Sequence, residues 1–94
     1  MNSPVFDTRT APQLAPRYVF RWEPSQDAYV LLYPEGIIKL NGSAGEILKR
    51  CDGSRSEDAI VVELQQVFPD GGAAVAESTR QFLAFARGRG WLQS

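Results

Sequence analysis

Residues able to carry out covalent or acid–base chemistry are few in this chain of 94 residues, which has one cysteine and no histidine. Histidine is the most common general base and metal ligand, so its absence removes the usual source of both roles. Cys51 lies on the apolar stripe of a helix expected over residues 43–51, where a buried thiol acts as a small apolar side chain. A single cysteine can form neither an internal disulfide nor a cysteine metal cluster.

Two adjacent acids, Glu57 and Asp58, are the other candidates for chemistry. They stand at the expected start of a helix, where the helix dipole favours negative charge without any catalytic role. The glycines in 71–72 and 88–90 are too sparse to form a loop that cradles phosphate. We therefore expect no enzymatic activity, no cofactor and no metal site.

The overall charge also limits the choice of partner. Ten basic and eleven acidic residues give a net charge of −1, so the chain offers no broad attraction to nucleic acid or to an anionic membrane. Its N-terminus lacks the basic and apolar regions of a signal peptide, and no apolar run approaches the ~20 residues of a membrane span. These features predict a cytoplasmic protein with one small domain.

The first sixteen residues differ from the rest in composition. Pro4, Pro12 and Pro16 stand among Ser, Thr and Asn, and proline both removes backbone donors and disfavours helix before it. We predict a flexible arm over residues 1–16 and a folded domain over residues 17–94.

Three strands are expected at the start of this domain. Residues 17–22 alternate so that Tyr18, Phe20 and Trp22 share one face, which is typical of a half-buried strand. Residues 28–33 are rich in β-branched and aromatic side chains, and residues 37–40 form a short third strand. The connections, including a type I turn at Tyr33-Pro34-Glu35-Gly36, are too short for parallel crossovers, so the sheet is antiparallel. Trp22 and the distant Trp91 are both expected in the core.

The hydrophobic period then becomes helical. The first helix begins with either Ser43 or Asn41 as its cap and ends at Asp52-Gly53. Ser54 to Glu57 matches a second capping box, before a helix that extends to Phe68. A third helix is expected over residues 73–89, followed by Trp91 and Leu92 folded back onto the core. The fold class is α+β, a three-stranded antiparallel sheet followed by a three-helix bundle, with a winged-helix-like layout.

A winged-helix layout raises the alternative of a nucleic-acid-binding protein. The second helix of such a unit normally carries Arg, Lys, Asn or Gln toward base edges. Residues 55–68 instead contain three acids and one arginine, which would be repelled by phosphates. We therefore expect no nucleic-acid partner.

Two features point to a peptide-binding groove. The third strand lies at the end of the meander, and residues 36–40 contain one lysine and no proline to blunt an open edge. The third helix has a wide apolar arc, because Phe85 lies about 60° from Phe82 at ~100° per residue. An extended peptide could add to the edge as another strand. Packing of the same surface against residues 1–16 or a second subunit is the alternative.

The chain resembles the PqqD family of pyrroloquinoline quinone biosynthesis. The resemblance spans residues 17–92, and the YPEG…LN spacing is its most specific part. It rests on Trp22, Tyr33-Pro34-Glu35-Gly36, Leu40-Asn41, Asp52-Gly53, Phe68-Pro69, Phe82-Leu83 and Trp91.

This resemblance implies a RiPP recognition element, a non-catalytic module that binds a ribosomally made precursor peptide. PqqD-like proteins bind the peptide PqqA and deliver it to PqqE, a radical S-adenosylmethionine enzyme. They hold the leader as an added strand beside the third strand and beneath the third helix. Carried over to this chain, the implied peptide-binding residues are Gly36, Ile37, Ile38, Lys39, Leu40, Val75, Ser78, Phe82, Phe85 and Arg89.

Two further expectations concern protein partners. A homodimer is compatible with so small a core. The charged outer face of the third helix, including Glu77 and Arg80, is a candidate contact for the enzyme.

Overall fold

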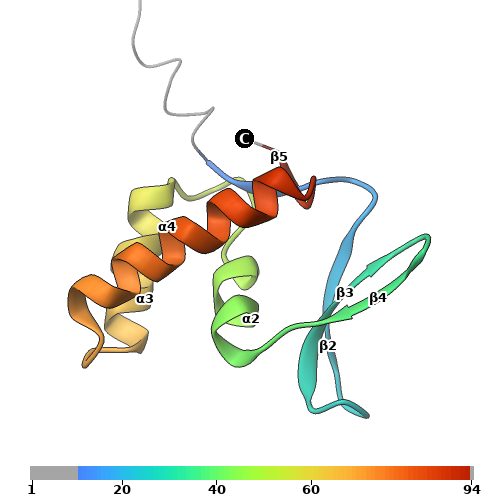
Figure 1. Cartoon of the computed structure of the whole chain (residues 1–94), viewed down its shortest axis with the longest axis horizontal. Coiled ribbons are helices and arrows are strands. Elements are labelled where there is room, and N and C mark those ends of the chain that lie inside the picture. Colours follow the sequence, from blue (N-terminus) through green and yellow to red (C-terminus); the bar gives the residue numbers. More distant parts are fainter. Residues whose placement is uncertain (1–10, 94) are drawn as a thin grey trace, which may run out of the picture.

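The computed structural model describes residues 11–93 (Figure 1). A three-stranded sheet is followed by three helices, and two short strands lie near the ends of this part of the chain. The elements are β1 (Gln13–Leu14), β2 (Val19–Glu23), β3 (Ala28–Tyr33), β4 (Gly36–Lys39), α2 (Gly42–Lys49), α3 (Glu57–Val67), α4 (Gly72–Gly88) and β5 (Leu92–Gln93). The predicted fold class is confirmed.

The main sheet is an antiparallel meander in the order β2–β3–β4. Val19 pairs with Leu32, which in turn pairs with Ile37. The strand β2, which was expected over residues 17–22, begins two residues later, because the backbone N–H of Tyr18 donates to the carbonyl of Ala15 at 3.0 Å. That turn holds residues 17–18 out of the ladder.

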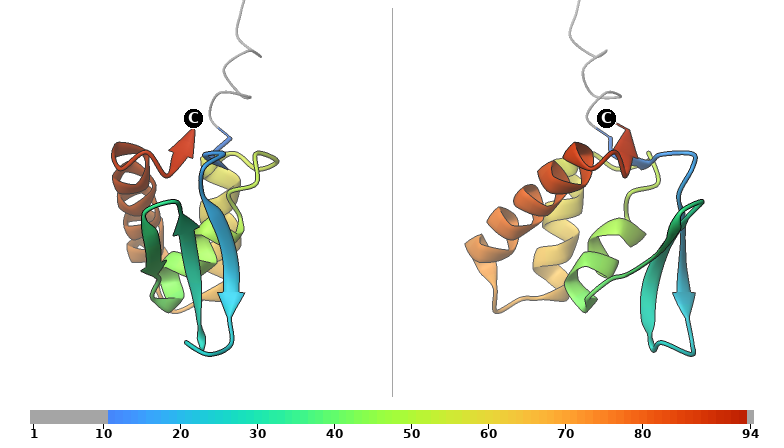
Figure 2. Two further views of the ribbon diagram at one scale, coloured as in Figure 1. Left: turned by 90° about the vertical axis from the view of Figure 1, so that its right-hand side faces the viewer. Right: turned by 45° about the vertical axis from the view of Figure 1, so that its right-hand side comes forward.

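The helices cover only one face of this sheet. In both views of Figure 2 the helices lie on the same side of β2, β3 and β4. The covered face contributes Leu31 to the core cluster, and Ile38 packs against that cluster. The helix α2 lies directly on β3, since a Cβ at Gly45 would come within 2.7 Å of the Tyr29 ring. Only glycine permits this approach without a shift of the ring.

The helix caps settle the alternatives that the sequence left open. Asn41 caps α2, its side-chain oxygen accepting from the Ala44 N–H at 2.8 Å. Ser56 caps α3 by accepting from the Ala59 N–H. The capping box expected at Ser54 is wrong, because its backbone N–H and its hydroxyl both bond to Asp52 within the preceding loop.

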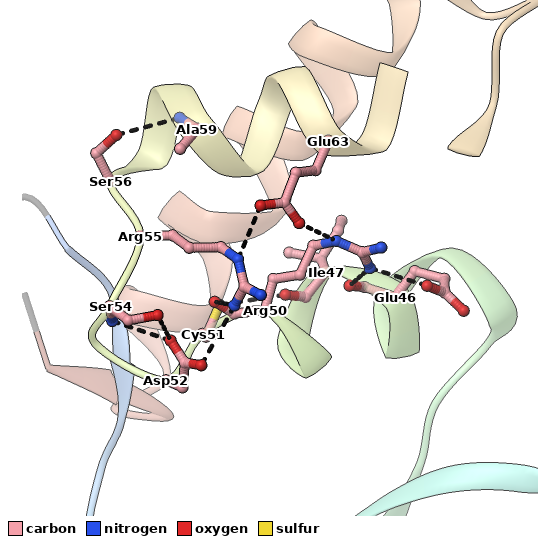
Figure 3. Close-up of polar contacts among 10 residues, drawn as sticks. All are labelled: Glu46, Ile47, Arg50, Cys51, Asp52, Ser54, Arg55, Ser56, Ala59 and Glu63. Carbon is pink, nitrogen blue, oxygen red and sulfur yellow. Dashed lines mark hydrogen bonds and ion pairs between the residues drawn. The ribbon is translucent and has the colours of Figure 1, made fainter. Parts of the chain in front are cut away.

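An ion-pair network holds α2 against α3 (Figure 3). Glu63 on α3 accepts from Arg50 at 3.0 Å and from Arg55 at 2.8 Å. Arg50 also bonds to both the carboxylate and the backbone carbonyl of Glu46. The Arg50 side chain is mostly buried, so this network fixes the position of α2 more firmly than an exposed ion pair could.

The expected flexible arm needs correction where it meets the domain. Pro12 is buried, and Gln13–Leu14 pair antiparallel with Leu92–Gln93. The Ala15 N–H also donates to the carbonyl of Trp91 at 2.8 Å. These contacts join residues that are too remote in sequence for local patterns to reveal. Residues 1–10, the remainder of the expected arm, lie outside the described residues.

The two tryptophans have different positions. Trp91 is buried in the core, as predicted. Trp22 is not a core residue, because it is 47% exposed. It shares a face with Phe20 but lies toward the end of the sheet, where its ring packs edge to face with that of Tyr29. Alternation assigned its face correctly, whereas the extent of helix cover decided its burial.

Candidate functional site

The strand β4 forms one outer edge of the main sheet, on the side where α4 passes behind it (Figure 2, left). The N–H of Leu40 donates to the carbonyl of Tyr29 at 3.0 Å, which sets the phase of the β3–β4 ladder. Opposite residues of an antiparallel pair alternate between bonded and non-bonded pairs. Ile38 therefore bonds toward β3, whereas the N–H and C=O groups of Ile37 and Lys39 point away from it.

This phase divides the five predicted strand positions. Ile37 and Lys39 direct backbone groups outward, and no other strand of the described residues pairs with that edge. By the same alternation, the backbone groups of Gly36, Ile38 and Leu40 form hydrogen bonds to β3 within the sheet. Leu40 is buried as well, and it supports the edge from inside the core. Of the five predicted strand residues, only Ile37 and Lys39 thus have backbone groups available to a guest strand.

The C-terminal half of α4 presents aromatic surface on the predicted apolar arc. Phe82 packs against the core, whereas Phe85 is 51% exposed. The Phe85 and Trp91 rings are nearly perpendicular with centroids 5.6 Å apart, and the Arg89 guanidinium lies 5.4 Å from the Phe85 centroid. Trp91 thus fixes the orientation of an aromatic ring that remains half open to solvent.

The N-terminal half of α4 borders a pocket of about 400 Å³, within the usual range for small ligands or side chains. Val75 and Ser78 were predicted site residues that line it. The other lining residues were missed, because α2, α3 and α4 each contribute to the pocket and no local pattern connects them. These residues are Ser43, Ile47, Leu64, Phe68, Ala74 and Thr79.

The predicted helix residues therefore divide into two groups along α4. Val75 and Ser78 lie at the pocket, whereas Phe82, Phe85 and Arg89 lie at the aromatic end. Between these groups lie Thr79, which is buried, and the exposed polar residues Arg80 and Gln81. The pocket and the aromatic end of α4 can each contact side chains of a bound peptide, and neither role needs a reactive group.

Charges around the site are unevenly paired. Among the residues that the structure describes, Lys39 is exposed and has no ion pair. Arg80, by contrast, bonds to Glu57 at 2.9 Å and to Asp58 at 2.8 Å. It therefore connects α4 to the start of α3, which weakens the expectation that it reaches toward an enzyme. The same contacts give Glu57 and Asp58 a structural role.

The Cys51 thiol lies within the core and not at the groove. Burial raises the pKa of the Cys51 thiol to about 12, and its Sγ donates to the carbonyl of Ile47. Within residues 11–93 no group of His, Cys, Asp and Glu side chains could hold a metal ion. Across the same residues, no helix has both the length and the apolar character needed to cross a membrane.

The arrangement of sheet, edge strand and helices defines a known class of module. The chain is similar to the solution NMR structure of the PqqD part of Methylobacterium extorquens PqqCD, with a TM-score of 0.72 and 25% identity over 88% of each chain. That protein is described as a functional, stand-alone recognition element for ribosomally synthesized and post-translationally modified peptides. The fold of this chain is therefore that of a RiPP recognition element.

Sequence comparison places the chain more narrowly. Residues 28–92 match the family model described as coenzyme PQQ synthesis protein D. A PqqA binding protein from Pseudomonas entomophila is 51% identical over 93% of this chain and 94% of its own. One from Azotobacter vinelandii is 48% identical over 87% of this chain and 88% of its own. The chain belongs to the PqqD family.

Proposed function

We propose that this chain is a non-catalytic cytoplasmic module that binds the precursor peptide PqqA by strand addition at β4. It then presents the bound peptide to the radical S-adenosylmethionine enzyme PqqE. The outward-facing backbone groups of Ile37 and Lys39 carry the proposal, because they lie on an open edge beside the apolar surface of α4. The names of the similar proteins, which are PqqA binding proteins, support the choice of peptide.

Four backbone hydrogen bonds are available to the peptide, one donor and one acceptor from each of Ile37 and Lys39. Each such bond contributes only about 0.5–1.5 kcal/mol after the loss of water contacts. Ordering a flexible peptide costs on the order of 2–5 kcal/mol. The backbone bonds alone therefore leave little surplus, and apolar contacts with Phe85 and the α4 pocket must provide most of the affinity.

Presentation to the enzyme follows from holding only part of the peptide. A leader fixed at β4 leaves the reactive segment tethered but free. When the module also contacts the enzyme, a short tether raises the local concentration of that segment to about the mM range. The enzyme then needs no extended binding surface of its own for the leader.

Amide hydrogen exchange of single residues tests strand addition directly. In the chain alone, the amides of Ile38 and Leu40 should exchange slowly because both donate within the sheet, whereas those of Ile37 and Lys39 should exchange fast. Saturation with PqqA should slow exchange at Ile37 and Lys39 by at least about tenfold. Each amide gains a hydrogen bond to the peptide, and this bond must break before the amide can exchange. NMR with labelled protein resolves each of these amides.

The opposite edge provides the matched control. The strand β2 is the other outer strand of the sheet, and its exposed edge should show no new protection. Peptide that binds without slowing exchange at Ile37 and Lys39 would refute strand addition at β4. A homodimer that used this edge would protect the same amides in a concentration-dependent manner without peptide, and would compete with PqqA.

A further inference from the structure

The outer face of the main sheet carries two rows of side chains that end at the open edge. The first row is apolar and consists of Val19, Leu32 and Ile37, paired directly across the strands. Val19 is 55% and Ile37 56% exposed. Because side chains alternate along a strand, Val19 and Ile37 lie on the face opposite that of Leu31 and Ile38. The helices cover only the other face of the sheet (Figure 2).

The second row is basic at both ends. Arg21 pairs with Val30, and Val30 pairs with Lys39. The Arg21 guanidinium already bonds to Glu23 at 2.9 Å. Lys39 has no such partner among the described residues, and it stands at the edge where the row stops.

A strand added at β4 would extend both rows by one residue each. The outward backbone groups belong to Ile37 and Lys39, so the guest residues beside them are two apart in the peptide. Side chains two apart share a face of a strand, so both would lie on the outer face. The guest residue between them would face the helices instead. These relations hold whether the guest runs parallel or antiparallel to β4.

The chemistry of the rows then specifies the guest residues. Beside Ile37, an apolar side chain would continue a row that is already apolar and half exposed. Beside Lys39, a carboxylate would supply the ion partner that the ammonium lacks. Opposite charges placed directly across two strands are favourable, and like charges are unfavourable.

We propose that Lys39 and Ile37 select the docking segment of the precursor peptide. This segment carries an Asp or Glu two residues from an apolar residue, both on the same strand face, and its intervening residue faces α4. The inference rests on the proposed function, since it requires a guest strand at β4. It adds the side-chain pattern that the guest must have and the position of its carboxylate.

Charge reversal on both partners tests the pattern. We would measure the affinity of Lys39→Glu for PqqA and for variants of PqqA in which each Asp or Glu is changed singly to Lys. Lys49→Glu is the matched control, because Lys49 is also exposed, lies on α2 and gives the same change in net charge. Calorimetry at low and high salt gives the affinities, and NMR spectra show that each variant is folded.

Lys39→Glu should bind unaltered PqqA about fivefold more weakly or worse, given the scale of cross-strand ion pairs. Lys49→Glu should bind it within about twofold of the parent chain. One Asp or Glu to Lys variant of PqqA should bind poorly to the parent chain and recover affinity with Lys39→Glu. High salt should reduce the difference, because the pair is exposed to solvent.

Two other results would overturn the inference, and they differ in what they leave standing. Equal weakening by Lys39→Glu and Lys49→Glu with every peptide would remove Lys39 as a selector, while protection of the Ile37 amide would still support strand addition. The second result is that Lys39→Glu leaves the affinity for PqqA unchanged and the Ile37 amide stays unprotected with peptide bound. In that case both the selector and the proposed docking edge are wrong.

Discussion

Truncation of Phe85 gives a quantitative test of the apolar part of the proposed groove. Full burial of a phenylalanine side chain stabilises by about 1.5–3 kcal/mol. Phe85 is 51% exposed in the chain alone, so a bound peptide can bury only about half of that surface. Phe85→Ala should therefore weaken PqqA binding by roughly 0.8–1.5 kcal/mol, or about four- to twelvefold in Kd.

The assay is calorimetric titration of the folded variant with PqqA. The fold should persist, because the contacts that Phe85 loses are those with the Trp91 and Phe82 rings and with the Arg89 guanidinium. Val62→Ala is the matched control, since Val62 is 53% exposed and lies on α3, away from β4. An unchanged Kd for Phe85→Ala, or an equal loss for Val62→Ala, would show that α4 does not form the groove.

Three further predictions concern the scaffold. The Cys51 pKa is about 12 against 9.0 for an exposed thiol, so at pH 8 the folded chain should react with a disulfide reagent about a thousandfold more slowly than the unfolded chain. Because the unfolded thiol ionises first, stability should fall as pH rises above 9.0 toward 12, and a chemical denaturation series that stays flat there would contradict its burial. Glu63→Gln should lower the free energy of unfolding by about 1–2 kcal/mol, since it weakens two arginine contacts at once. Glu35→Gln, which affects only the exposed pair with Arg17, should cost less than about 1 kcal/mol, and equal losses would mean that the network adds nothing.

Much of the fold could be predicted from sequence because its signals are local. The period-2 alternation before residue 34 and the helical period after residue 43 depend only on neighbouring residues. The turn at Tyr33-Pro34-Glu35-Gly36 joins β3 to β4 as expected. Capping was harder, because Asn41 and Ser43 both stand near the start of α2, and Ser54 and Ser56 near the start of α3. Only the loop geometry selects Asn41 and Ser56.

The candidate site was partly accessible by the same means. The wide apolar arc of α4 was visible on a helical wheel, and the exposure of Phe85 agrees with it. The pocket near Val75 and Ser78 was not accessible, since three helices contribute to it. Neither was the position of Arg80, whose partners lie more than twenty residues away.

The sequence by itself determined which segments become strands and helices, and which side chains share a face, because these properties depend on residues a few positions apart. Local sequence also fixes which backbone groups of β4 face outward, because the two-residue turn between Tyr33 and Gly36 sets the register of β4 on β3. Only the tertiary structure decided that this edge lies open beside α4, because no local pattern shows which segments are its neighbours. The same holds for residues 12–15, which are held by Cys51 and Trp91 rather than by their own neighbours. Burial and the neighbours of an edge are properties of contacts between distant segments, and those contacts exist only once the chain has folded.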